Sequence, residues 1–181
     1  MATLRKNNVE KYLRHFAESV IKRGRQILKA KKKNVTGKLL DSLKYRLEAT
    51  SKGYNLVFKG AKHAMFVDKG VSGTKTTRTY HNIFGKRERS PFKYTNKKPH
   101  PSVFDKWIVK KGLKGTRDEK GRFVSRKSLK FALREHIFQK GIAATSFFSK
   151  PMSIELANFD TGILKAFKTD IITHFETLEL K

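Results

Sequence analysis

Two long stretches with apolar residues at helical spacing, one near each end of the chain, constrain the fold most strongly. The first runs from about Asn8 to Lys32, and its stripe comprises Val9, Tyr12, Leu13, Phe16, Val20, Ile21, Ile27 and Leu28. The second comprises Ile163, Phe167, Ile171, Ile172, Phe175 and Leu178. Both patterns predict amphipathic helices. If the second stripe is buried within the subunit, Phe167→Ala should cost about 3–5 kcal/mol; a near-neutral effect would indicate that the helix packs on a partner.

Two alternating segments after the first helix predict a β-hairpin. The apolar positions are Tyr45, Leu47 and Ala49 in KYRLEAT, and Tyr54, Leu56 and Phe58 in YNLVFKG. The turn SKG between them suits an antiparallel pair. Before the hairpin we expect a short helix from Gly37 to Leu43, capped by Thr36. After the hairpin, AKHAMFVD predicts another short helix that ends at Gly70.

The second half of the chain alternates irregular and helical segments. Residues 71–100 are rich in Gly, Thr, Lys and Arg, which predicts an extended basic loop or a long hairpin. PSVFDKWIVKKG predicts a helix with Val103, Trp107 and Ile108 inward and Gly112 as its stop. The segment LKGTRDEKGRF that follows is expected to be a charged, exposed turn.

Two further helices are expected beyond residue 124. SRKSLKFALREHIFQKG places Leu129, Ala132, Leu133, His136 and Ile137 on one side, and SKPMSIELANF has Pro151 near its first turn. The length of 181 residues favours one domain. We therefore predict a single domain, residues 1–181, with an irregular basic insertion at about 71–100.

The charge of the chain is large and uneven. Its 42 Lys and Arg residues face 15 Asp and Glu residues, which gives a formal net charge of +27. Residues 151–181 carry a net charge of −2, so residues 1–150 carry +29. Such an excess repels itself, and a polyanion or an acidic protein surface is expected nearby. The absence of cysteine fits a reducing compartment, and neither a signal peptide nor a membrane-spanning run is recognised.

Catalytic signatures are not found in the sequence. It contains no HExxH pair and no phosphate-binding loop, and the pairs His63/Asp68 and His100/Asp105 are spaced too poorly to share a helix face. Glu88, Asp118 and Glu119 are flanked by Lys and Arg, which favours a solvated loop over a carboxylate pair. His15 and His136 lie within or beside apolar stripes and are expected in the core or at its boundary. We predict no enzymatic activity, no cofactor and no metal site.

Basic residues are the stronger functional signal. Residues 74–130 contain 18 Lys and Arg against 4 acidic residues, and the candidates for contact with DNA or a subunit interface are Lys86, Arg87, Arg89, Lys93, Lys97 and Lys98. Phe84, Phe92 and Tyr94 lie among them and could stack on bases, although anchoring to the core is the favoured interpretation. No groove-reading motif is present, so any nucleic-acid contact is expected to be independent of sequence.

Two sets of short motifs resemble the phage head–tail joining proteins, the neck or tail-completion family of long-tailed phages and prophages. The segment TGKLLDSLKYRL, a strand, and then HAMFVDKGVSGT are similar to the first set at Gly37, Leu40, Ser42, Ala64, Val67, Asp68 and Gly70. The ending IFQKGIAATSFFSKP is similar to the second set at Ile137, Gly141, Phe148 and Pro151. His63 stands where the family usually has Tyr, Asp68 where it has Glu, and VSG is inserted before Thr74.

This resemblance implies an α+β fold in which a small antiparallel sheet packs against long amphipathic helices. It also implies a structural virion protein, one subunit of a closed six-fold or twelve-fold ring at the neck or tail of a phage. Portal, adaptor or tail proteins would be its neighbours, DNA would pass through the ring held by non-specific electrostatics, and assembly would take place in the bacterial cytoplasm. A sequence-independent basic nucleic-acid-binding protein, monomeric or dimeric, is the alternative.

Overall fold

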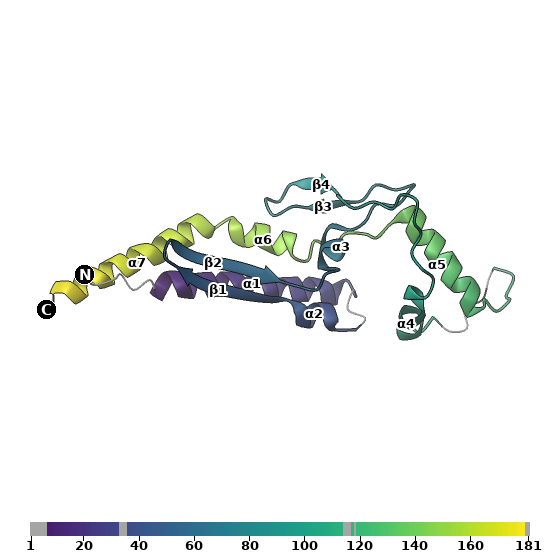
Figure 1. Cartoon of the computed structure of the whole chain (residues 1–181), viewed down its shortest axis with the longest axis horizontal. Helices are drawn as coiled ribbons and strands as arrows, with labels where there is room; N and C mark the ends of the chain where they lie inside the picture. Colours follow the sequence, from purple (N-terminus) through teal and green to yellow (C-terminus); the bar gives the residue numbers. More distant parts are fainter. Residues whose placement is uncertain (1–6, 33–35, 114–116, 118, 180–181) are drawn as a thin grey trace.

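The computed structural model describes residues 7–32, 36–113, 117 and 119–179 of the chain. In these ranges the fold is α+β, with seven helices and two small two-stranded antiparallel sheets (Figure 1), which confirms the predicted class. The helices are α1 (Asn7–Ala30), α2 (Lys38–Ser42), α3 (Ala64–Lys69), α4 (Val103–Lys110), α5 (Arg126–Lys140), α6 (Ser149–Leu156) and α7 (Phe159–Glu179). The strands are β1 (Lys44–Thr50), β2 (Gly53–Lys59), β3 (Thr79–His81) and β4 (Arg87–Arg89).

Helix α1 is the centre of the fold, as its strong apolar periodicity predicts. It packs against α6 and α7 and also against both strands of the first sheet. Its buried face consists of Val9, Leu13, Phe16, Ala17, Val20, Gly24 and Leu28. At Gly24 the approach is so close that a Cβ would lie 2.8 Å from the carbonyl oxygen of Phe147. The long helix therefore needs a glycine at this crossing.

The predicted hairpin forms between β1 and β2. Tyr45 pairs with Phe58 and Leu47 with Leu56, so the apolar positions of both strands share one face of the sheet. This face meets the helices: the rings of Phe58 and Phe148 pack edge to face, with centroids 5.3 Å apart. Lys44, Arg46 and Lys59 lie on the other face, together with Glu48, Asn55 and Val57.

Helices α2 and α3 complete a small core between the hairpin and α1. Leu28, Leu39, Leu40, Leu43 and Phe147 form its buried cluster, with Ala64, Val67 and Phe148 packed around them. The prediction that Thr36 caps α2 is wrong. Gly37 occupies the N-cap position with φ of 76°, in the left-handed region, where Gly is favoured. Gly70 ends α3 as predicted.

Residues 71–100 form a short hairpin, β3–β4, flanked by irregular chain. Beyond it, α4 and α5 pack on each other and lie apart from α1 and the first sheet (Figure 1), except that the Lys111 ammonium donates a hydrogen bond of 3.2 Å to the carbonyl of Lys32, just after α1. The segments that lead into and out of the α4–α5 pair lie side by side, and there the Lys98 ammonium lies 2.6 Å from the Glu135 carboxylate. The prediction that Val103 faces inward is wrong, since Phe104 and Ile108 are the buried residues of α4. Part of the predicted turn at 113–123 lies outside the described residues.

Helix α5 departs from its prediction as well. Leu129, Leu133 and Ile137 are only half-buried, and no residue of this helix is fully buried. His136 is exposed, and so is His15 in α1, although both were expected in the core or at its boundary. The physical reason is that the small helix α4 cannot cover a full face of α5, and the contacts of α5 with Thr74, Lys75, Tyr94 and Lys98 lie near its C-terminal end.

Helix α7 is tied to α1 by a buried carboxylate. Asp170 is 2% exposed and accepts hydrogen bonds from the backbone amides of Asn8, at 2.9 Å, and Val9, at 3.1 Å. These amides belong to the first turn of α1 and have no partner within their own helix. Asp170 therefore caps α1 from a position 162 residues away in the sequence.

We expect Asp170→Ala to lower the free energy of unfolding by about 1–3 kcal/mol, because it leaves buried amides without an acceptor. Asp160→Ala is the matched control: its carboxyl is exposed in the first turn of the same helix, and its loss should cost at most about 1 kcal/mol. Urea denaturation followed by circular dichroism measures both. Equal losses for the two variants would show that the Asp170 cap contributes no special stability.

Candidate functional site

A buried carboxylate joins the two parts of the chain that carry the family resemblance. Asp68, at the end of α3, is 5% exposed and accepts hydrogen bonds from the backbone amides of Phe148, at 2.8 Å, and Ser149, at 3.2 Å. The Ser149 hydroxyl donates to the same carboxylate. These amides belong to the start of α6, whose own N-cap residue supplies no side-chain cap. Asp68 therefore caps α6 across 80 residues of sequence.

The backbone around Asp68 is paired with the same distant segment. The carbonyl of Val67 accepts from the amide of Thr145 at 3.0 Å and from its hydroxyl at 2.7 Å. The carbonyl of Asp68 accepts from the amide of Ser146 at 2.9 Å. Ser146 has φ of 49°, uncommon for a residue other than Gly, and its hydroxyl accepts from the backbone amide of His81. The surrounding bonds hold this conformation in place.

Three glycines allow the two segments to touch directly. Val71 and Ile142 exchange two backbone hydrogen bonds, of 2.9 and 2.8 Å. A Cβ on Gly73 would collide with the backbone at Gln139, and one on Gly141 would collide with the carbonyl of Val71. A Cβ on Gly70 would lie 2.7 Å from the carbonyl oxygen of Ile142. We call residues 67–75 and 138–149 together the backbone junction.

Most positions of the family resemblance lie at or beside the backbone junction. Asp68, Gly70, Gly141 and Phe148 belong to it, and Pro151 follows in the first turn of α6. Leu40, Ala64 and Val67 lie in the neighbouring core cluster. Ser42 connects the hairpin to that cluster, because its hydroxyl accepts from the amide of Ala61 at 2.9 Å and donates to the carbonyl of Leu39. Gly37 stands apart, at the start of α2.

The six candidate basic residues are exposed but do not form one patch. Lys86, Arg87 and Arg89 lie on the tip and second strand of the β3–β4 hairpin. Lys93 follows, in a bridge with Ser72 of the backbone junction. Lys97 and Lys98 lie further along, where the chain reaches α5, and Lys98 is occupied by Glu135. The β3–β4 hairpin thus carries three of the six cations, of which Arg87 also donates a hydrogen bond to the Thr79 hydroxyl at 2.9 Å.

Two of the three aromatic residues among these cations anchor the chain, as favoured from the sequence. The rings of Phe92 and Phe66 have centroids 4.5 Å apart, and those of Tyr94 and Phe138 are 6.2 Å apart. Phe84, at the hairpin tip, is 75% exposed. Only Phe84 is therefore placed to contact another molecule through its whole ring.

The acidic residues of this region bind neighbouring side chains. Glu88 accepts from the Tyr80 hydroxyl at 2.9 Å and from the Asn82 amide at 2.6 Å. The pKa of the Tyr80 hydroxyl is raised, mainly by burial and secondly by its hydrogen bond to Glu88. The pKa of the Glu135 carboxyl is lowered, mainly by the hydrogen bond from Lys98 and secondly by the one from Gln139. Glu88 thus links Tyr80 and Asn82 within the β3–β4 hairpin.

A second basic surface was not predicted from the sequence. An open groove of about 800 Å³ runs between α1 and β1, and its cationic lining consists of Lys22, Arg25, Lys29 and Lys44. Arg25 is held in place because its guanidinium donates to the backbone carbonyls of Leu40 and Leu43. Lys22, Arg25 and Lys29 belong to α1 and Lys44 to β1, so only the position of the first hairpin beside the helix brings them together.

Sequence reasoning also missed Gly73, Ser149 and Asp170. Gly73 lies in the VSG segment that departs from the family pattern, although the close approach at the backbone junction depends on it. Ser149 has a usable local signal, because a hydroxyl residue just before Pro151 is typical of a helix start. Asp170 has none, because its partners lie at the other end of the sequence.

Comparison of the chain with known protein families, curated proteins and solved structures finds no match. Among the described side chains, no three His, Asp or Glu residues lie together as a metal ion would require. Within the same ranges, every helix is too short or too polar to cross a membrane.

We expect Gly141→Ala to be strongly destabilising, by about 4 kcal/mol or more, because it combines a left-handed backbone with a collision at Val71. Gly112→Ala is the matched control. Gly112 has φ of +65° but open space around it, so this change should cost only the conformational term, about 1–2 kcal/mol. Chemical denaturation measures the free energy of unfolding of both variants. Similar losses would show that the backbone junction can widen to admit a methyl group.

Proposed function

We propose that this protein is a structural virion protein, one subunit of a closed ring at the head–tail junction of a phage. The observation that carries the proposal is the backbone junction. The two motif sets that resemble the head–tail joining family are separated by about 70 residues of sequence, yet Asp68 and three glycines bring them together. Residues of this kind shape a scaffold; they supply neither a nucleophile nor a proton-transfer pair.

The surfaces of the subunit suit assembly around DNA. Cations lie on the β3–β4 hairpin and along the groove beside α1, without the clustered geometry that reads bases. A ring lumen needs loose, sequence-independent attraction of this kind. Head-to-tail contacts that close by rotation would place the same cations around the axis in every copy. Portal, adaptor or tail proteins would then meet the flat faces of the ring.

The groove beside α1 also supports a second candidate, a sequence-independent nucleic-acid-binding protein that works as a monomer or dimer. Light scattering of the purified protein, with and without duplex DNA across a salt series, separates the two candidates. A ring of six or twelve copies supports the first. A monomer that coats duplex DNA, with affinity falling steeply as salt rises, contradicts it.

A charge-reversal variant tests the role of the β3–β4 hairpin. With Lys86, Arg87 and Arg89 all changed to Glu, we expect impaired ring assembly or DNA retention and an unchanged unfolding midpoint, because these side chains are exposed. The control changes the exposed Lys11, Lys52 and Lys106 to Glu, which alters the formal charge equally but on three separate elements. If both triple variants assemble and retain DNA like the wild type, the hairpin does not face DNA or a neighbour.

A further inference from the structure

Helix α7 packs on α1 by one face, and the other described elements leave a set of large apolar side chains on its remaining surface exposed. At 100° per residue, positions 159, 162, 166 and 170 share the face that packs on α1. Phe159 contacts the rings of Tyr12 and Phe16, and Gly162 lies directly against Tyr12. The rest of the helix surface carries an exposed set that we call the α7 stripe, with Phe167 on the flank and the others on the far side: Leu164, Phe167, Ile172 and Phe175. Phe167 is 42% exposed, so it is not buried within the subunit, and a large loss of stability from Phe167→Ala is not expected.

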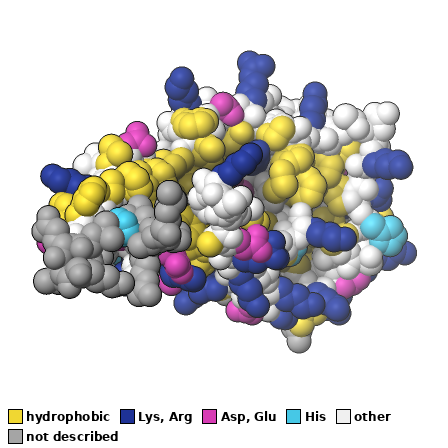
Figure 2. All heavy atoms as spheres, turned by 60° about the vertical axis from the view of Figure 1, so that its left-hand side comes forward, with side chains coloured by type: hydrophobic (Ala, Val, Ile, Leu, Met, Phe, Trp, Pro, Cys, Tyr) yellow, Lys and Arg dark blue, Asp and Glu magenta, His cyan; other side chains and the backbone are white. Residues whose placement is uncertain are grey.

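The α7 stripe is unusual in size and exposure. Leu164 is 65% exposed and Phe175 is 60% exposed. Figure 1 shows α7 projecting beyond the first sheet, and Figure 2, which brings that side forward, shows hydrophobic side chains gathered across this part of the surface. Lys168 lies among these residues on the same side of the helix. Large exposed apolar side chains gathered on one helix of a charged protein still mark an interaction surface.

A complementary surface lies elsewhere on the same molecule. A cavity of about 300 Å³ opens between β2, α3 and the β3–β4 hairpin, and we call it the Met65 cavity. Its apolar lining includes Phe58, Met65, Ile83 and Phe147, and its cations are Lys59 and Lys69. Asp68 also lines it, but its carboxylate is already bonded at the start of α6. Met65 is 56% exposed at its mouth. The cavity is large enough to admit aromatic or branched side chains from a helix.

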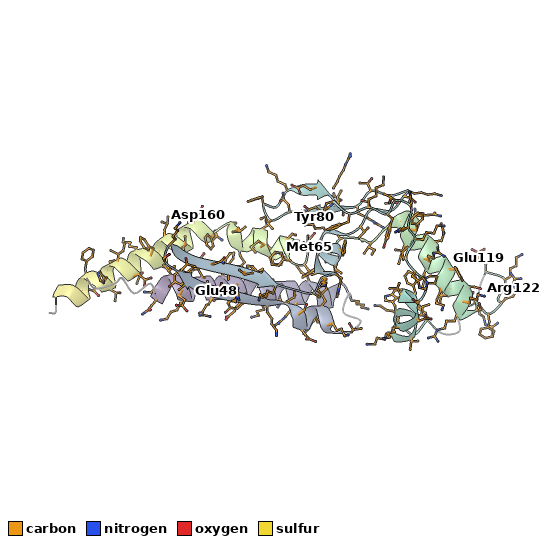
Figure 3. The ribbon with its side chains drawn as sticks, viewed as in Figure 1. Glu48, Met65, Tyr80, Glu119, Arg122 and Asp160 are labelled. Carbon is orange, nitrogen blue, oxygen red and sulfur yellow. The ribbon has the colours of Figure 1, made fainter. Side chains whose placement is uncertain are left out.

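The α7 stripe cannot reach the Met65 cavity of its own chain. Figure 3 shows Met65 on α3 close to the β3–β4 hairpin, whereas Asp160 marks the start of α7, which then runs away from that region. A contact between the two surfaces must therefore join two molecules. Because each chain carries both surfaces, the contact would be heterologous and could repeat around a ring.

Charge favours the same pairing. Residues 151–181 have a net charge of −2, while the remainder of the chain is strongly basic. Asp170 is buried against α1 and Glu155 is paired with Arg23, so Asp160 and Glu176 are the acidic side chains that the described part of α7 exposes, beside Lys165 and Lys168. Two copies of a +27 protein repel each other unless an acidic segment of one meets cations of the other. Glu176 lies beside Phe175 near the end of α7, and Lys59 and Lys69 line the Met65 cavity. Electrostatic complementarity of this kind selects the partner and its orientation.

We propose that the α7 stripe of one subunit packs into the Met65 cavity of a second copy, so that each subunit donates its last helix and receives that of its neighbour. This inference rests on the proposed function, because it names the surfaces through which the ring would close. The exposed apolar residues of the α4–α5 pair are a poorer receiver: Val103, Val109, Phe123 and Phe131 are exposed, but they line none of the cavities described above.

Cysteine cross-linking tests the contact directly, because the sequence contains no cysteine. Met65→Cys and Ile172→Cys proteins are purified separately, mixed, and treated with a short bis-maleimide. We expect a cross-linked dimer with one copy of each variant, identified by mass spectrometry. A mixture of Ile172→Cys with Thr50→Cys, exposed at the end of β1, is the control. Cross-linking of Ile172→Cys to itself, or equal yields in both mixtures, would overturn the proposal.

A charge placed in the α7 stripe provides the second test. Ile172→Glu should raise the concentration needed for self-association by roughly tenfold or more, since a carboxylate would be buried against apolar side chains. Thr173→Glu adds the same group at the next, exposed position and should associate like the wild type. Unfolding midpoints of both variants are measured alongside, and the cysteine pair remains decisive if Ile172→Glu proves unstable.

The outcomes separate this inference from the proposed function. If the Ile172→Glu protein forms rings at the same concentration as the wild type, the α7 contact is overturned, whereas the proposed function as a ring subunit is not. A wild-type protein that stays monomeric at every concentration, with no cross-link above the control, also overturns the α7 contact. Only tight, salt-sensitive coating of duplex DNA by that monomer would overturn the proposed function as well.

Discussion

The Asp68 carboxylate and the glycines beside it hold together two parts of the chain that are distant in sequence. A buried carboxylate is costly unless its oxygens are satisfied, and here two amides and a hydroxyl at the start of α6 satisfy them. That bond fixes where α6 begins, and α6 in turn packs against α1 and leads into α7. The position of the last two helices, and of every surface they present, thus follows from one capped helix end.

Charge explains why so much apolar surface is left at one end of the molecule. A chain with a formal charge of +27 gains solubility from repulsion between copies and can tolerate exposed hydrophobic side chains that would otherwise cause aggregation. Lys and Arg residues are spread over the β3–β4 hairpin, the groove beside α1 and the α4–α5 pair, whereas residues 151–181 have a net negative charge. Repulsion between copies is therefore weakest near residues 151–181, the segment that carries the α7 stripe.

Local patterns predicted the elements that depend on local physics. The periodicity of α1 and the alternation of β1 and β2 identified their faces, because both elements bury those faces against immediate neighbours. The prediction was wrong at Val103 and at Thr36, where packing and a left-handed Gly37 decide the outcome. The two carboxylate caps and the glycine contacts were not predicted, because each depends on residues at least 60 positions away.

The route of the chain through α4 and α5 has a consequence for how this protein can vary. The segment from Lys98 to Glu135 begins and ends at one ion pair, and the adjacent rings of Tyr94 and Phe138 close its base. The entropy of closing such a loop grows slowly, by about 0.6 kcal/mol for each doubling of its length. Evolution could therefore shorten, lengthen or replace this segment as an interchangeable module while the rest of the subunit kept its shape.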